Sequence, residues 1–287
     1  MFLMGLKCIQ INHKNEKCDN ELFSYIFLKL IILTKVTMTM NKHQLVNLIK
    51  KLFNIDINRS KDLVINQAIN FEKEVIFVAI PKTGTTSVRS QIQQTGKPII
   101  SNPHLNILQI KDLIYIYLLK KTLGTNRIFP NISLPSDNKL RQKADNIFES
   151  FFKFSAVRNP WARTVSLYSR REGIQIKDKF TFEEFCIEHM YASDTCHHTT
   201  LHKNQLDWLT SIKGQLLVDF VYKVEEYEDA IIEIKDRTNG RLVLDNAKLN
   251  VNPYSKSHNY RSMYNNKTRK IIEKRFEKDI DYFKYTF

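Results

Sequence analysis

The sequence contains few cysteines, and none of them forms a recognised metal motif. Four cysteines in 287 residues are too few for a fold stabilised mainly by disulfides. They are Cys8, Cys18, Cys186 and Cys196. A Cys186–Cys196 bridge is an open alternative. Cysteines and histidines gather between residues 186 and 202, but no CxxC pair occurs there, and we expect no metal site.

Long apolar runs are also missing. The apolar stretch at residues 22–33 contains Lys29 and is shorter than the roughly 20 residues that a spanning helix needs. Lys35 interrupts the apolar pattern again soon after this stretch, and no clean signal-peptide cleavage pattern is present. These absences argue against a spanning helix and favour a cytoplasmic protein. Membrane attachment through residues 22–40 is the alternative.

Acidic residues are outnumbered by basic ones. The chain has 44 Lys and Arg against 30 Asp and Glu, which gives a formal net charge of +14. Such a charge favours polyanionic partners, namely a bisphosphate cofactor, an acidic glycan, nucleic acid or an anionic membrane. Because we find no long run of like charge and no nucleic-acid motif, we expect no nucleic-acid partner. A lysine-rich bias on a solvated surface would explain the same excess.

Apolar segments alternate with helical patterns over residues 72–287. Buried strands are predicted at 75–80, 151–157 and 216–223, and helices at 87–95, 107–121, 160–171, 180–190, 201–211, 226–236 and 266–278. This alternation predicts an α/β fold with a P-loop-like parallel sheet and helices on both faces. A Gly, Pro and Asn-rich loop is expected at 124–138. Before this domain we expect a poorly defined or unstructured segment at 1–40, then an amphipathic helix and linker at 41–71.

The first motif with chemical content follows the strand at 75–80. It reads Pro81-Lys-Thr-Gly-Thr-Thr-Ser87 and precedes a helical stretch. A loop between a strand and a helix binds phosphate through free backbone N–H groups and the positive end of the helix. Lys82 adds a full charge. The nucleotide P-loop places its lysine after the last glycine, whereas here lysine comes first, so the sequence indicates a different kind of phosphate site.

The second motif follows the strand at 151–157. Asn159 can cap a helix, and Pro160 suits the first helical turn, where the missing N–H costs nothing. Arg158 directly follows the strand, and Ser166, with its hydroxyl, comes about two helical turns later. A guanidinium and a hydroxyl suit a terminal phosphate. Ligands of parallel sheets bind beyond the carboxyl ends of the strands, so one ligand with two separated phosphate groups would span both motifs.

These two segments resemble those of a known family. The segment from Ile80 to Ser87 resembles the 5′-phosphosulfate loop of sulfotransferases that use 3′-phosphoadenosine 5′-phosphosulfate (PAPS). The segment Ala156-Val-Arg-Asn-Pro-Trp-Ala-Arg-Thr-Val-Ser-Leu-Tyr168 resembles their 3′-phosphate motif, above all in the carbohydrate (family 2-like) branch. The tail, at 252–264 and 280–287, is similar too. The resemblance covers residues 72–287 and implies the sulfotransferase fold, PAPS as sulfuryl donor and a hydroxyl acceptor, with carbohydrate favoured.

The resemblance also implies roles for individual residues. Lys82 would stabilise the leaving group, and Arg158 with Ser166 would hold the 3′-phosphate. The residues that would bind the 5′-phosphosulfate together with Lys82 are Thr83, Gly84, Thr85, Thr86 and Ser87. Lys256 and Ser257 would close over the nucleotide. Lys223 stands where relatives often carry arginine, which leaves any acceptor-side role for this position in doubt.

A general base has to be found separately, because Lys82 should be cationic. His104 lies in the loop before the helix at 107–121, comparable to the His or Glu of family members, and histidine suits proton transfer near neutral pH. His197 and His198 are rival candidates. We expect Trp161 to pack in the core rather than stack on adenine. For Arg163 and Arg170, solvent and an acidic acceptor are both open.

Two other functions fit parts of this pattern. A kinase or NTPase could share the architecture, but the sequence has no Gly-Lys-Ser/Thr loop, and the strand at 151–157 exits into arginine rather than a magnesium-binding aspartate. A non-enzymatic, basic polyanion-binding protein would explain the charge alone. Binding of adenosine 3′,5′-bisphosphate without metal, compared with Mg-ATP, separates these alternatives from a sulfotransferase.

Overall fold

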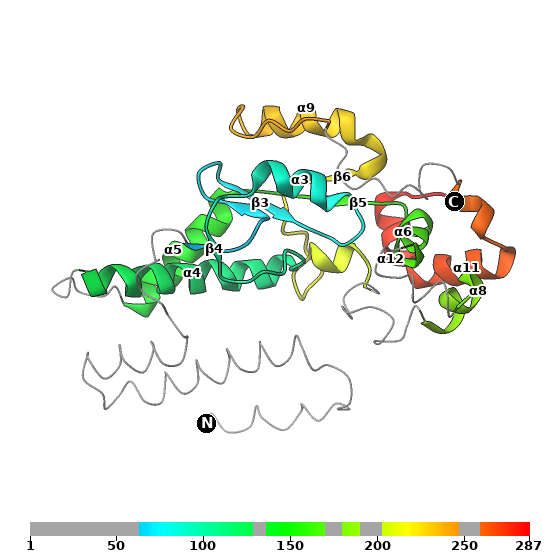
Figure 1. Ribbon diagram of the computed structural model, residues 1–287, viewed down its shortest axis with the longest axis horizontal. Helices are drawn as coiled ribbons and strands as arrows, with labels where there is room; N and C mark the ends of the chain where they lie inside the picture. Colours follow the sequence, from blue (N-terminus) through cyan, green and yellow to red (C-terminus); the bar gives the residue numbers. More distant parts are fainter. Residues whose placement is uncertain (1–62, 129–135, 170–179, 190–202, 247–258) are drawn as a thin grey trace, which may run out of the picture. The chain divides into compact units, whose positions relative to one another are not determined.

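A four-stranded sheet organises the part of the chain that carries both motifs. The computed structural model describes residues 63–128, 136–169, 180–189, 203–246 and 259–287, all within the compact unit Ile57–Cys196 with Thr200–Phe287. The sheet order is β2 (Ile69–Asn70), β3 (Val75–Val78), β5 (Phe152–Val157) and β6 (Phe220–Lys223). Strands β3, β5 and β6 are parallel, as Figure 1 shows for β3 and β5. Motif loops at the ends of β3 and β5 therefore share one edge.

The sheet is mixed rather than wholly parallel. β2 pairs antiparallel with β3 through Ile69–Ile76 and Asn70–Val75. The prediction of an α/β fold with parallel strands is thus confirmed only in its coarser form. A second, short pair joins β1 (Leu63–Val64) in parallel to β4 (Lys97–Pro98). Strands of two residues are too short to show the alternation by which a strand is recognised in sequence.

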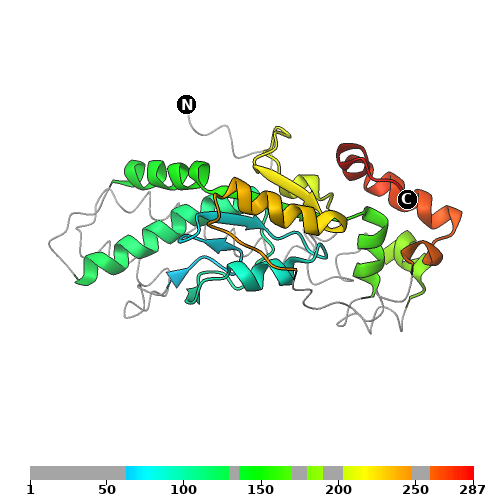
Figure 2. The same cartoon turned by 90° about the horizontal axis from the view of Figure 1, so that it is seen from above.

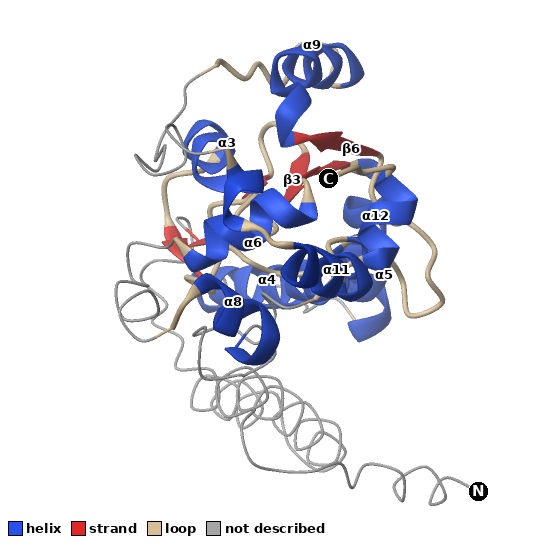
Figure 3. Ribbon diagram, turned by 90° about the vertical axis from the view of Figure 1, so that its right-hand side faces the viewer, coloured by secondary structure: helices blue, strands red, loops and turns tan. Residues whose placement is uncertain are grey.

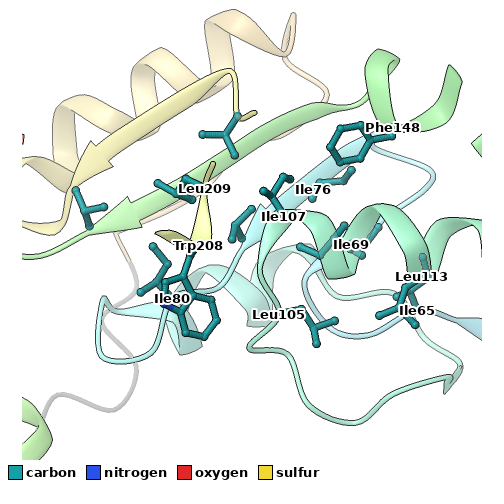
Figure 4. Close-up of a cluster of buried hydrophobic side chains, with 14 of the residues drawn as sticks. Ile65, Ile69, Ile76, Ile80, Leu105, Ile107, Leu113, Phe148, Trp208 and Leu209 are labelled. Carbon is teal, nitrogen blue, oxygen red and sulfur yellow. The ribbon is translucent and has the colours of Figure 1, made fainter. Parts of the chain in front are cut away.

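Helices cover both faces of the sheet (Figures 1 and 2). Alternate side chains of β3 point to opposite faces, with Phe77 in one hydrophobic cluster and Ile76 in the other. On the face of Phe77 pack α3 (Thr85–Ile92) and α9 (Tyr227–Arg237). On the face of Ile76 pack α4 (Ile107–Ile128) and α5 (Asp137–Ser150). Figure 4 shows this second cluster, in which Trp208 and Leu209 lie with Ile80 and Ile107.

Figure 3 faces a group of shorter helices, among them α6, α8, α11 and α12. Helix α6 follows β5 directly in the chain. Contacts join α6 to α11 and η7, α11 to η3, and α12 to η5. The bounds of these and the remaining elements are α6 Pro160–Tyr168, α8 Phe182–Glu184, η3 Phe185–His189, η5 Leu206–Trp208, η6 Val224–Glu226, η7 Tyr260–Met263, α11 Asn266–Arg275 and α12 Glu277–Phe283. Among the described residues, no helix is long and apolar enough to cross a membrane.

The prediction of a helix at 201–211 is wrong. The described part of this range forms only the 3-10 turn η5, after which Thr210 bridges to Leu216. In an α-helix the N–H groups of Gln205 and Leu206 would donate to carbonyls four residues earlier. They donate instead to the carboxylate of Asp279, at 2.8 and 3.0 Å. A tertiary contact therefore replaces the helical hydrogen bonds.

Helix α5 was not foreseen. It begins after Ser136, within the range expected as loop, and buries Leu140, Ala144 and Phe148 at helical spacing. Lys153, which interrupts the apolar pattern of β5, ends this helix. Its Nζ donates to the carbonyls of Phe148, Glu149 and Phe151, at 3.0, 3.2 and 2.8 Å. These are carbonyls that a helix end leaves without intrahelical donors.

Candidate functional site

The two motif loops meet at the ends of neighbouring parallel strands. Val78 of β3 pairs with Ser155 of β5, and the Ser155 hydroxyl donates to the Val78 carbonyl at 2.7 Å. Beyond the strand ends, Nη1 of Arg158 donates to the carbonyl of Lys82 at 3.4 Å. The structure thus brings together Lys82 and Arg158, which lie 76 positions apart in sequence. What they bind stays a prediction.

The loop between β3 and α3 has a constrained backbone. Lys82 and Gly84 both have left-handed conformations, with φ of 70° and 73°. Glycine adopts this region freely, whereas lysine does so at a cost on the order of 1 kcal/mol. The Thr83 hydroxyl donates to the Ile80 carbonyl at 2.9 Å and fastens the turn. Such strain at Lys82 is typical of a functional position.

The start of α3 offers backbone donors. Its N-cap is Gly84, and no side chain caps this end. The first N–H groups of a helix have no intrahelical acceptor, which makes an uncapped N-terminus suitable for an anion. Thr85 is buried, and Thr86 and Ser87 are half-buried. The loop therefore combines backbone donors with hydroxyl groups, as a phosphate-type ligand requires.

The start of α6 is different, because the side chain of its N-cap residue, Asn159, already caps it. The Asn159 Oδ1 accepts from the N–H groups of Trp161 and Ala162, at 3.1 and 3.3 Å. Pro160 has no N–H to offer. An anion at this strand end would therefore be bound by side chains. Arg158 and Ser166 are both half-buried there.

The guanidinium of Arg158 is a partly desolvated cation. Burial lowers its pKa, and the nearby Glu225 and Tyr285 oppose this shift. Arginine nevertheless keeps its charge in proteins, so a desolvated guanidinium gains from an anionic partner. Glu225 itself accepts from the N–H of Asn159 at 3.0 Å and from the Tyr285 hydroxyl at 3.4 Å. It orders the same strand end from η6.

Arg163 has a structural position rather than a solvent-facing one. Its side chain is 1% exposed, its Nε donates to the Pro81 carbonyl at 3.1 Å, and its Nη1 donates to the Lys203 carbonyl at 3.4 Å. The alternative that Arg163 faces solvent is therefore wrong. Together, Arg158 and Arg163 hold two successive carbonyls of the first loop. Arg170 lies outside the described residues.

His104 lies beside the first loop. Its Nδ1 is 2.7 Å from the Ala79 carbonyl oxygen, and its backbone N–H donates to Asn102 Oδ1 at 2.9 Å. A carbonyl only accepts, so Nδ1 carries the hydrogen, and in the neutral ring Nε2 holds the lone pair. This tautomer is the one that can take a proton through Nε2. The rival candidates His197 and His198 lie outside the described residues.

Other sequence-predicted residues have structural contacts or cannot be placed. Trp161 is 2% exposed, packs edge-on against Phe287 and donates from Nε1 to the Arg269 carbonyl, as expected for a core residue. Lys223 pairs with Glu226 at 3.5 Å. Lys256 and Ser257 lie outside the described residues.

Metal and thiol chemistry find little support in the described residues. Cys186 is a free, buried thiol, and burial raises its pKa to about 12, which opposes thiolate reactivity. No group of three or more potential ligands occurs among the residues that the structure describes. His198 and His202 stand four positions apart, a spacing that suits two ligands on one helix face, but both lie outside the described residues.

Three polar residues at this site carried no sequence signal. They are Gln205, Glu225 and Asp279. Gln205 and Asp279 are fully buried, and Gln205 bonds to the backbone of Arg158. Each is a single polar residue in an unremarkable context, and its partner is distant in sequence. Only the burial of polar groups, which requires partners, reveals them.

Comparison with known proteins gives a family. The model of the sulfotransferase family matches residues 67–286, which include both motif loops and β2. No curated protein and no solved structure matches the chain.

Proposed function

Because the chain belongs to the sulfotransferase family, we propose that it moves a sulfuryl group from PAPS to a hydroxyl of a carbohydrate. The family supports sulfuryl transfer in general. The donor and the acceptor class are our proposal. They are supported by the order of the two motifs, their resemblance to the carbohydrate branch, and the basic charge of +14. Membrane association through residues 22–40 and a cytoplasmic location stay open expectations.

The residues at the two strand ends fit a donor that is charged at both ends. The uncapped start of α3 and the hydroxyls of Thr85, Thr86 and Ser87 suit the 5′-phosphosulfate. The guanidinium of Arg158 and the hydroxyl of Ser166 suit the 3′-phosphate. The observation that carries this proposal is the hydrogen bond from Arg158 to the Lys82 carbonyl, because it joins the two loops in one site.

The donor would supply a sulfuryl group. Its transfer breaks the bond to the 5′-phosphate of the nucleotide, which is the leaving group. Lys82 would stabilise the charge that develops on this leaving group, and one such preorganised donor is typically worth about 3 kcal/mol. The backbone of the loop holds Lys82 in place, since Arg158 and Arg163 fix the carbonyls of Lys82 and Pro81. Positioning of this kind is the protein's main contribution in loose, in-line transfers.

His104 would take the proton of the attacking hydroxyl. The Ala79 carbonyl orients the ring and fixes the hydrogen on Nδ1, so Nε2 is the proton acceptor. Since Ala79 lies three positions before Lys82, the segment that carries the lysine also orients the base. General-base catalysis of this kind contributes roughly 100- to 10,000-fold.

Two measurements test the proposal. The first follows transfer of labelled sulfate from PAPS to a panel of glycans, with Lys82→Ala as the inactive control. The second compares thermal stabilisation by adenosine 3′,5′-bisphosphate without metal and by Mg-ATP. Stabilisation by the bisphosphate supports the sulfotransferase. Stabilisation by Mg-ATP alone would favour the kinase or NTPase alternative, and binding without any transfer would favour a polyanion-binding protein.

A further inference from the structure

The side-chain amide of Gln205 pairs with the backbone of Arg158. Its Oε1 accepts from the Arg158 N–H at 2.9 Å, and its Nε2 donates to the Arg158 carbonyl at 2.8 Å. Gln205 is fully buried. The two bonds fix both peptide groups that flank the Arg158 Cα atom. Because β5 ends at Val157, the sheet itself no longer provides these bonds.

Asp279 of α12 fixes Gln205 in turn. Its Oδ2 accepts from the Gln205 N–H at 2.8 Å and from Nε2 at 3.2 Å, while its Oδ1 accepts from the Leu206 N–H at 3.0 Å. Nε2 therefore meets two acceptors, a carbonyl and a carboxylate, which leaves one orientation for the amide. Asp279 is also fully buried, as a carboxylate with several donors can be.

We propose that Gln205 is a positioning residue that presets Arg158 for the 3′-phosphate, with Asp279 holding Gln205 in its orientation. This inference rests on the proposed function. A side chain whose backbone is already ordered loses less conformational entropy when it binds, so the affinity for its ligand rises. The effect is greatest at the end of the ligand that Arg158 contacts, because the Lys82 loop depends on Arg158 only through one hydrogen bond from its Nη1.

A purely structural role for Gln205 predicts a different result. Loss of a buried hydrogen-bonding group would then weaken every ligand of the site to a similar degree. A role through Arg158 weakens ligands that carry a 3′-phosphate more than ligands that lack it. The ratio of affinities for adenosine 3′,5′-bisphosphate and for adenosine 5′-monophosphate separates the two roles.

The test measures both dissociation constants by calorimetry in the full chain, for wild type, Gln205→Met and Gln215→Met. Gln215 has an exposed side chain and serves as the matched control. We expect Gln205→Met to reduce the preference for the bisphosphate about tenfold, as the loss of two hydrogen bonds would, with a smaller loss of affinity for the monophosphate. Gln215→Met should keep the wild-type ratio. An unchanged ratio in Gln205→Met, or an equal loss for both ligands, overturns the inference.

A double-mutant cycle makes the role of Arg158 explicit. In a chain that already carries Arg158→Ala, Gln205→Met should change the ratio no further, since the two residues act as a unit. Additive losses would contradict this. If Gln205→Met does not fold, Asp279→Leu serves instead, because it removes the carboxylate that accepts from Gln205 Nε2 and keeps a similar volume. A wild-type ratio in Asp279→Leu overturns the inference, whereas a wild-type protein without any preference for the bisphosphate overturns the proposed function itself.

Discussion

Arg163 and Pro81 are joined by a hydrogen bond, from Nε to the carbonyl oxygen at 3.1 Å, across 82 positions of sequence. This bond links α6, which follows the second motif, to the residue directly before Lys82. The position of Lys82 therefore depends on a residue that need not contact any ligand.

Replacing Arg163 by Lys should lower turnover while keeping most of the stability. The positive charge of Arg163 favours the ionised form of the buried Asp279, and lysine retains this charge. Lysine cannot, however, reach the Pro81 and Lys203 carbonyls together. We expect kcat for sulfate transfer to fall about tenfold, in line with the sensitivity of catalysis to small displacements. Arg163→Met should in addition lower the free energy of unfolding by about 3 kcal/mol, because it removes the donors of two carbonyls and a positive charge that favours the ionised form of the buried Asp279. Wild-type kcat in Arg163→Lys would rule out a role in placing the loop.

Lys82→Gly should separate stability from activity. Glycine relieves the left-handed strain at φ 70°, so the free energy of unfolding should stay unchanged or rise by up to about 1 kcal/mol. Turnover should fall on the order of 100-fold or more, because the variant lacks the lysine cation that stabilises the leaving group. Chemical denaturation and sulfate-transfer assays measure the two quantities.

Lys284→Gly is the matched control for this variant. Lys284 also has a left-handed conformation, with φ 55°, but it ends α12 and its side chain is exposed. It should show the same small change in stability with wild-type turnover. Full activity in Lys82→Gly would remove Lys82 from the catalytic scheme.

His104→Ala should lose most turnover and keep nucleotide binding. The imidazole is the proton acceptor in the proposed reaction, so its loss should cost roughly 100- to 10,000-fold in kcat. The dissociation constant of adenosine 3′,5′-bisphosphate should change little, which calorimetry measures. His104→Gln keeps a donor for the Ala79 carbonyl and should be as inactive as the alanine variant. Recovery of activity in the glutamine variant would assign His104 to positioning instead.

Trp208 offers a test of the core next to the first loop. It is 2% exposed, and within the described structure its Nε1 is buried without a hydrogen-bond acceptor. Trp208→Phe removes this costly group and keeps most of the apolar contact, so the free energy of unfolding should change by less than about 1.5 kcal/mol. Trp208→Ala should lower it by about 3 to 5 kcal/mol. Equal losses in both variants would show that the indole N–H does have a partner.

The sequence alone was sufficient where the signal is local. Two strands, each followed by a small-residue or capping segment and a helix, predict loops at one edge of a sheet, and Lys82 and Arg158 indeed lie together. Trp161 was also foreseen as a core residue. These inferences depend only on neighbouring residues and on the general geometry of parallel strands.

The remaining parts could not be predicted, because they depend on distant contacts. Gln205 meets Arg158 across 47 positions, and Asp279 meets Gln205 across 74. The same contact with Asp279 replaced the helix expected at 201–211. β2 is too short to leave a pattern, and Lys153 looked like an interruption of β5 although it caps α5. Single polar residues acquire such roles only when the fold buries them.

The capped start of α6 has a consequence for how this site can change. The Asn159 side chain already accepts from the first amides of α6. Binding of an anion at the carboxyl end of β5 therefore depends on side chains, which a mutation can replace. The tip of β3 instead presents main-chain N–H groups, which every amino acid except proline supplies. Point mutations would therefore leave the main-chain part of binding at the end of β3 unchanged, whereas one substitution could change or abolish binding at the end of β5. A switch in nucleotide preference among descendants of this chain should therefore start at Arg158 or Ser166.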